Sequence, residues 1–155
     1  MVERKGQESA LFLLLRAAAV FREDIEAVIA TEPSMPDVLR RLHGGQRRLL
    51  TLIPPAGARG TDLAARAGIT PQSLGEFAAG LAEVGLATAG VDPGDRRARL
   101  WRLTPDGERA ARAAREVIAS VEAAWRDMLG DRDYERLIAT LRRVGAQHQS
   151  ADRRA

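Results

Sequence analysis

The segment Asp92–Gly107, which reads DPGDRRARLWRLTPDG, decides the fold. It opens with Asp92-Pro93-Gly94-Asp95, four residues that favour a turn. Aspartate side chains hydrogen-bond to nearby backbone groups, proline fixes φ, and glycine tolerates positive φ. The short run Leu86–Val91 precedes this turn, and Ala98–Leu103 follows it with Trp101 and Arg102 on opposite faces. Two short extended runs joined by turn residues predict a β-hairpin, with Trp101 packed in the core.

The hairpin carries a high density of positive charge. Four arginines fall within seven residues: Arg96, Arg97, Arg99 and Arg102. Asp92 and Asp95 offset only part of their mutual repulsion. We interpret Arg96, Arg97 and Arg99 as contacts to DNA phosphates or to the minor groove, with one wing arginine paired to Asp92 or Asp95 to stabilise the loop. The alternative is a solvated hairpin whose arginines and aspartates pair only with each other.

Two short helices are predicted before the hairpin. The first begins at Thr61, a good N-cap, and ends at Gly68, which suits the left-handed cap position. The second begins with Thr70 as cap and Pro71 at the first helical position, and it ends at Gly85. Two helices joined by a tight glycine turn predict a helix-turn-helix, and a following hairpin makes it a winged DNA-binding architecture.

Amphipathic helices flank this motif on both sides. Apolar residues recur at spacings of three and four over 8–30, 105–129 and 133–146, while a helical segment over 37–53 is interrupted at Gly44 and Gly45. The three flanking stripes are longer than a small winged domain can cover. They predict a homodimer with recognition helices about 34 Å apart on an inverted repeat. The alternative is a self-contained three-helix bundle.

The sequence resembles the MarR-type winged helix-turn-helix transcriptional regulators. The matching segments are Thr61–Ala64, Gly68–Leu74, Leu81–Leu86, and Asp92–Arg97 running into Leu103–Gly107. The resemblance implies a mainly α fold with a small β-hairpin wing (α+β), as one domain over 1–155. It places the winged lobe at 37–104 and the dimerisation helices at 8–30 and 105–147. It further implies a homodimeric repressor that binds a pseudo-palindromic operator in double-stranded DNA and is released by a small-molecule effector.

The predicted recognition helix departs from the family pattern. Members commonly carry Arg or Lys where this chain has Glu76, Gly80 and Ala89, and no basic residue lies between Arg66 and Arg96. A protein-interaction or ligand-sensing winged helix with weak or no operator binding is therefore the alternative function.

Base reading falls to the start of this helix. Gln72 and Ser73 can hydrogen-bond base edges, and Thr70 is available for a phosphate. Glu76 has two interpretations: it accepts from a cytosine amino group, or it is a solvated side chain that faces away from the DNA.

Other candidate residues lie outside the helix-turn-helix and wing. Arg47, Arg48 and Arg59 are candidate phosphate contacts, or else ordinary surface charges. An effector pocket of the kind found in the family is predicted at Phe12, Phe21 and Trp125, although core packing explains these residues equally well.

The sequence offers little for other classes of function. It has no cysteine, no Gly-rich phosphate loop and no metal-ligand spacing, and His43 and His148 lie far apart, so we expect no enzyme, metal or cofactor. The longest apolar stretch, Ala10–Phe21, contains Arg16 and is too short to cross a membrane. We expect a cytoplasmic protein that has no membrane partner.

Overall fold

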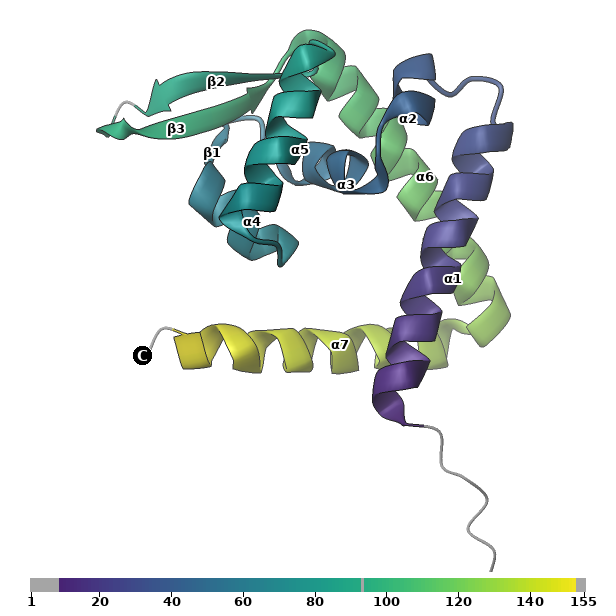
Figure 1. The fold of residues 1–155 in the computed structure, drawn as a ribbon. Helices are drawn as coiled ribbons and strands as arrows, with labels where there is room; N and C mark the ends of the chain where they lie inside the picture. Colours follow the sequence, from purple (N-terminus) through teal and green to yellow (C-terminus); the bar gives the residue numbers. More distant parts are fainter. Residues whose placement is uncertain (1–8, 93, 153–155) are drawn as a thin grey trace, which may run out of the picture. The chain divides into compact units, whose positions relative to one another are not determined.

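The computed structural model describes residues 9–92 and 94–152, which are mainly helical with one small sheet (Figure 1). The elements in chain order are α1 Ala10–Thr31, α2 Asp37–Arg41, α3 Gly44–Leu52, β1 Ala58–Arg59, α4 Gly60–Ala67, α5 Pro71–Glu83, β2 Ala87–Asp92, β3 Asp95–Leu103, α6 Pro105–Leu129 and α7 Asp131–Asp152. They form two compact units, Met1–Ile118 and Ala119–Ala155, divided within α6. The prediction of one domain over 1–155 stays a prediction.

Most helix boundaries follow the predicted capping signals, although α5 ends at Glu83 with Val84 as its cap, before the predicted Gly85. Thr70 caps α5 by accepting the Ser73 N–H at 3.1 Å, and Pro71 is the first helical residue. Thr104 likewise accepts the Gly107 N–H at 3.0 Å at the start of α6. Gly68 ends α4 with φ of 63° in the left-handed region. The predictions for Gly68, Thr70 and Pro71 are confirmed. They could be made from the sequence because each depends on residues that are close together in the chain.

Two helix starts differ from the prediction. The break after α2 falls at Leu42 and His43, since the His43 Nδ1 accepts the Gly45 N–H at 3.0 Å and Gln46 Oε1 accepts the His43 N–H at 2.8 Å. This reciprocal capping places the predicted glycine break inside the first turn of α3. Helix α4 begins at Gly60, and its N-cap is Arg59, which makes no side-chain capping bond and lies two residues before the predicted cap Thr61.

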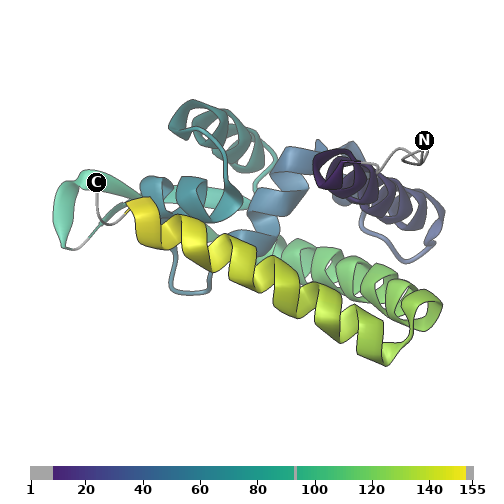
Figure 2. The same ribbon diagram turned by 90° about the horizontal axis from the view of Figure 1, so that it is seen from below.

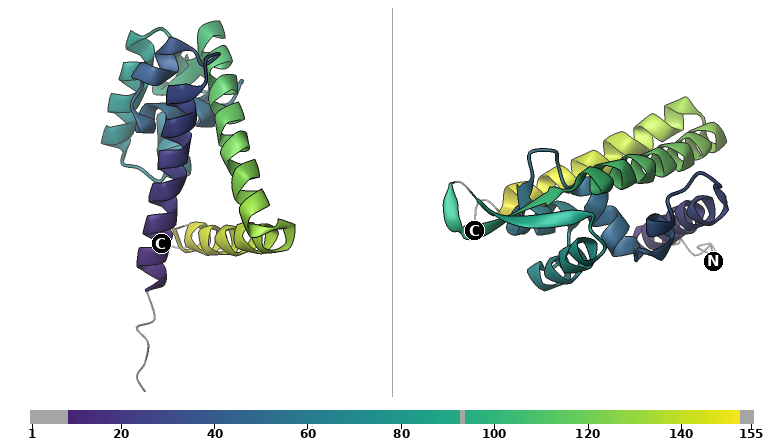
Figure 3. Two further views of the ribbon diagram at one scale, coloured as in Figure 1. Left: turned by 90° about the vertical axis from the view of Figure 1, so that its right-hand side faces the viewer. Right: turned by 90° about the horizontal axis from the view of Figure 1, so that it is seen from above.

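A third strand, β1, extends the predicted hairpin into a sheet of order β1-β3-β2 with antiparallel pairing. Ala58 pairs with Trp101 on one edge, and Ala87 pairs with Leu103 on the other. The hairpin projects from the helices of the first unit (Figures 1 and 3). Strand β1 has only two residues, so it is too short to show the alternating pattern from which a strand is predicted in the sequence.

Leucines from four helices form the centre of the first unit. The largest fully buried side chains are Leu39, Leu49, Leu50, Leu63 and Leu81. Trp101 is 9% exposed and joins this core, whereas Arg102 is half-buried, which confirms the predicted orientation of β3. Helix α6 contributes the buried alanines 110, 111 and 114, whose small side chains allow close packing.

The backbone of Leu86 joins α5, the hairpin and α6. Its N–H donates to the Leu81 carbonyl at 2.8 Å, and its own carbonyl accepts the Thr104 N–H at 3.1 Å. The Thr104 hydroxyl donates to the Gly85 carbonyl at 2.7 Å. A Cβ on Gly107 would lie 1.9 Å from the Leu86 oxygen, so only glycine allows α6 to begin against this backbone.

Arg47 is buried, with 8% of its surface exposed. Its guanidinium donates to the Leu39 carbonyl at 2.9 Å and to the Leu42 carbonyl, and it forms an ion pair with Glu26. It therefore links α1 to α2 and α3 as a structural residue, and its burial and these partners argue against the phosphate contact predicted for it. Nothing in the local spacing signals this, because Glu26 lies 21 residues away in sequence.

The second unit joins the end of α6 to α7 through Gly130, whose φ is 78°. Arg126 pairs with Asp131 at 3.1 Å and with Glu135 at 2.6 Å, and its guanidinium lies 4.6 Å from the centre of the Tyr134 ring. The hydrogen bond to Glu135, followed by that to Asp131, raises the pKa of Arg126. Helix α7 is continuous (Figure 2). None of the helices within the described ranges is long and apolar enough to cross a membrane.

Two glycine substitutions should have opposite effects on stability. Gly107→Ala forces a methyl group onto the Leu86 carbonyl, so we expect the free energy of unfolding to fall by about 1–3 kcal/mol. Gly75→Ala meets nothing within 4 Å in the middle of α5, and we expect a gain of about 0.5–1 kcal/mol. Urea unfolding of both variants measures the difference, and a gain for Gly107→Ala would contradict the described junction.

Removing the buried guanidinium should destabilise the first unit. Arg47→Met retains the side-chain stem but leaves the carbonyls of Leu39 and Leu42 without their donor, and we expect a loss of about 1–3 kcal/mol in the free energy of unfolding. Arg48→Met is the matched control, because Arg48 is exposed on the same helix. Equal urea midpoints for the two variants would contradict the structural role of Arg47.

Candidate nucleic-acid interface

Helix α5 presents one uncharged or acidic face to solvent. Its exposed residues include Gln72, Gly75, Glu76 and Ala79. Its buried residues, Leu74, Ala78 and Leu81, lie on the opposite face in the core. The predicted base readers therefore stand on an accessible surface, as a helix entering the major groove requires.

The two hydroxyls at the start of α5 bond to each other. The Thr70 hydroxyl accepts the Ser73 N–H and donates to Ser73 Oγ at 3.0 Å. A hydroxyl has one proton, so Thr70 has none left for a phosphate oxygen in this conformation. Ser73, which is half-buried, keeps its own proton as a donor.

Gln72 and Glu76 interact one turn apart on the exposed face. The Gln72 Nε2 donates to Glu76 Oε1 at 3.2 Å. This is a favourable i, i+4 pair on a helix. The sequence analysis considered the two residues separately, although their spacing alone could have indicated the pair.

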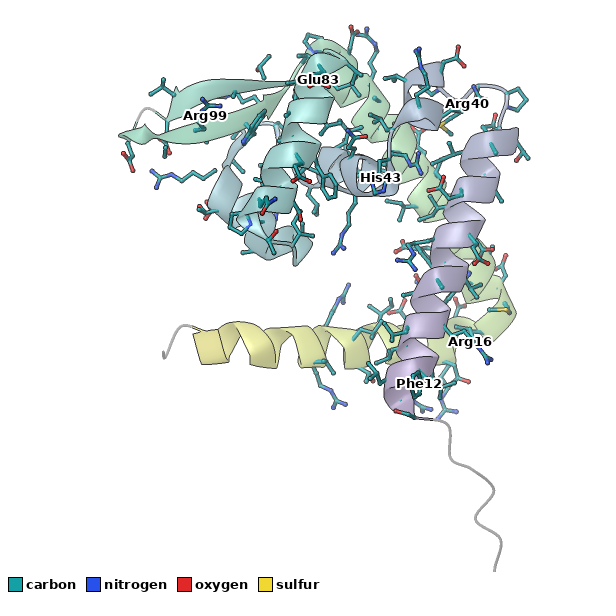
Figure 4. The ribbon with its side chains drawn as sticks, viewed as in Figure 1. Phe12, Arg16, Arg40, His43, Glu83 and Arg99 are labelled. Atoms are coloured by element: carbon teal, nitrogen blue, oxygen red, sulfur yellow. The ribbon has the colours of Figure 1, made fainter. Side chains whose placement is uncertain are left out.

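The wing is described in part. Arg99 is exposed on β3 (Figure 4) and Arg102 is half-buried. The backbone of Arg96 and Arg97 belongs to β3, while their side chains lie outside the described part of the structure. Their predicted contacts to DNA stay predictions.

Asp92 anchors the turn of the hairpin. Its Oδ1 accepts the Gly94 N–H at 2.8 Å, and its Oδ2 accepts from Arg59 Nε at 2.5 Å. The Gly94 bond, and then the Arg59 guanidinium, hold the pKa of Asp92 below its usual value, while Asp92 raises the pKa of Arg59. Among the side chains that the structure describes, Asp92 thus pairs with Arg59 of β1, while the predicted pairing of a wing arginine with Asp92 or Asp95 stays a prediction. In the sheet register Asp92 faces Asp95 across the turn.

The predicted effector residues belong to both units. Phe12 is 69% exposed on α1 (Figure 4), and Phe21 is half-buried on the same helix. Trp125 is half-buried in the second unit. The effector pocket stays a prediction.

A separate hollow of about 780 Å³ lies in the first unit between α2, α5 and the start of α6. Its lining includes Val38, Arg41, Gln46, Glu83, Val84 and Arg109.

No group of three or more His, Asp or Glu side chains within the described ranges is placed to hold a metal ion.

Breaking the anchor should loosen the wing in a pH-dependent way. Asp92→Asn retains an acceptor for Gly94 but loses the charge that pairs with Arg59, so we expect lower stability than wild type at pH 6. Because the folded-state pKa of Asp92 is lowered, its contribution is present above the ordinary aspartate pKa of about 3.9 and is lost as the pH falls through the folded value.

Urea unfolding of wild type and Asp92→Asn at pH 6 and pH 3 measures this contribution. The difference between the two proteins should shrink at the lower pH. A difference that is constant over this range would contradict the described ion pair.

Comparison with known proteins gives matches in structure and none in sequence. No protein-family model and no curated protein matches the chain. The solved structure of CouR from Rhodococcus jostii RHA1 bound to p-coumaroyl-CoA has a TM-score of 0.74 and 21% identity, covering 89% of this chain and 92% of that one.

Two further structures extend the likeness over nearly the whole chain. The transcriptional repressor CouR bound to a 23-mer DNA duplex has a TM-score of 0.75 and 23% identity, covering 93% of this chain and 97% of that one. A MarR-family transcriptional regulator from Rhodococcus sp. RHA1 has a TM-score of 0.73 and 19% identity, covering 90% and 98%. The chain therefore has the winged helix-turn-helix fold of the MarR-family transcriptional regulators.

Proposed function

We propose that this protein is a dimeric DNA-binding transcriptional regulator, acting as a ligand-responsive repressor on a pseudo-palindromic operator. The observation that carries the proposal is the accessible face of α5, with Gln72 and Ser73 at its start, in the same unit as a hairpin that exposes Arg99. A helix reads base edges and a basic hairpin contacts the backbone in this architecture. The likeness to DNA-bound CouR supports the same use of the fold.

Exposed apolar residues support the dimer. In the first unit the N-terminal half of α1 exposes Leu11 by 59%, Phe12 by 69% and Leu15 by 58%. In the second unit Met128 is 69% exposed and Val144 is 65% exposed. Clusters of large apolar side chains on a surface mark an interface, and a second copy of the chain is the partner that an inverted-repeat operator requires.

The wing supplies the electrostatic part of binding in this proposal. Helix α5 offers phosphates no cation, so affinity depends on Arg96, Arg97 and Arg99. Arg59 holds the turn through its Nε, which is engaged by Asp92, and its terminal nitrogens keep donors for a phosphate. The Ser73 hydroxyl replaces that of Thr70 as the donor at the helix start.

A small-molecule effector completes the proposal. CouR was solved with p-coumaroyl-CoA as well as with DNA, and NadR was solved with 4-hydroxyphenylacetate. An effector that binds the DNA-free state better than the DNA-bound state would release the operator.

Wing variants test the DNA-binding role. Each of Arg96→Ala and Arg97→Ala removes one proposed phosphate contact, so we expect the slope of log affinity against log salt to fall by about 1. Arg112→Ala on α6 is the control for loss of one exposed arginine and should leave the slope unchanged.

Fluorescence anisotropy with duplexes from the region flanking the gene, at several salt concentrations, provides both affinity and slope. Salt-sensitive binding that differs between fragments supports the regulator. Unchanged binding in both wing variants would contradict the wing assignment, and the absence of binding to all fragments would favour a protein-interaction module.

A further inference from the structure

The exposed start of α5 presents hydrogen-bond acceptors without any cation. Building on the proposed function, we propose that Gln72 and Glu76 form one base-reading pair, in which Glu76 selects a cytosine in each half of the operator. Three features of the described residues carry this inference: the bond between the two side chains, the open space around them and the negative charge.

The bond between Gln72 and Glu76 favours one orientation of the two side chains. The Gln72 Nε2 uses one of its two hydrogens on Glu76 Oε1 at 3.2 Å. The second amide hydrogen and the Oε1 of Gln72 remain available, as does the second carboxylate oxygen of Glu76. The bond therefore favours one pattern of donors and acceptors on this surface.

The surface around the pair is open enough for base edges to approach. Both side chains are exposed, and Gly75 lies between them with nothing within 4 Å of the position that a Cβ would occupy. Ala79, on the next turn, is also exposed and adds only a methyl group. No long side chain of this helix face holds the pair away from the major groove.

The chemistry of the major groove then selects the base. Thymine presents O4, and guanine presents O6 and N7, all of which repel a carboxylate oxygen. Adenine offers the N6 amino group but places the N7 acceptor beside it. Cytosine presents the N4 amino group and no acceptor of its own, so it is the base that best matches the free oxygen of Glu76.

The negative charge gives this arrangement a distinct signature. A carboxylate inside the groove is repelled by the phosphates of every sequence, and a donor from the correct base offsets that repulsion at one site only. Loss of Glu76 should therefore raise affinity for unrelated DNA while it lowers discrimination. A residue that only stabilised the helix would not shift these two quantities in opposite directions.

Selection from randomised duplexes by wild type, Glu76→Ala and Glu83→Ala tests the inference. Glu83 is the matched control, since it is an exposed acid of the same helix (Figure 4), seven residues or about two turns beyond Glu76. Both variants lose one negative charge from the same side of α5. Anisotropy titrations then measure binding to the selected site and to the site with thymine in place of cytosine.

Wild type and Glu83→Ala should prefer cytosine over thymine by about tenfold, and this ratio should fall close to one in Glu76→Ala. A selected motif without a shared cytosine, or an unchanged ratio in Glu76→Ala, would overturn the base-reading pair and leave the proposed regulator intact. If none of the three proteins selected any sequence, both the pair and the proposed function would be overturned.

Discussion

The two backbone groups of Leu86 connect the parts of the first unit that would meet DNA. Its N–H bonds the carbonyl of Leu81 in α5, and its carbonyl accepts the N–H of Thr104, where β3 ends and α6 begins. The absence of a side chain at Gly107 lets the helix approach this carbonyl. One buried residue thus connects α5 to both ends of the hairpin, and in the proposed regulator this connection would let the two elements contact one duplex.

Charge is divided between these two elements. Helix α5 carries Glu76 and Glu83 and no basic residue, whereas the hairpin carries four arginines within the segment Arg96–Arg102. Asp92 accepts hydrogen bonds from Gly94 and Arg59, so one carboxylate of the hairpin stabilises its turn. In the proposed regulator the hairpin supplies affinity, and the helix supplies discrimination.

Local sequence signals predicted most of the fold, because caps and turns depend on neighbours. Thr70-Pro71 and Gly68 both mark boundaries that the structure contains. The missed features, such as the strand β1 and the buried Arg47, depend on partners distant in sequence. For the candidate site, the position of Gln72 and Ser73 at the start of α5 followed from the Thr70-Pro71 signal. The partner of Asp92 did not, since Arg59 lies 33 residues before it.

In the proposed regulator, the acidic surface of α5 also affects how the protein is distributed between its operator and the non-specific DNA of a chromosome. Non-specific binding to DNA depends on the neutralisation of phosphates by cationic side chains. A carboxylate on the surface that faces the bases weakens this non-specific binding. A lower affinity for non-specific DNA shortens the lifetime of each non-specific complex and leaves a larger fraction of the protein free to bind its operator. Occupancy of the operator would then be reached with fewer copies per cell than a uniformly cationic helix would need.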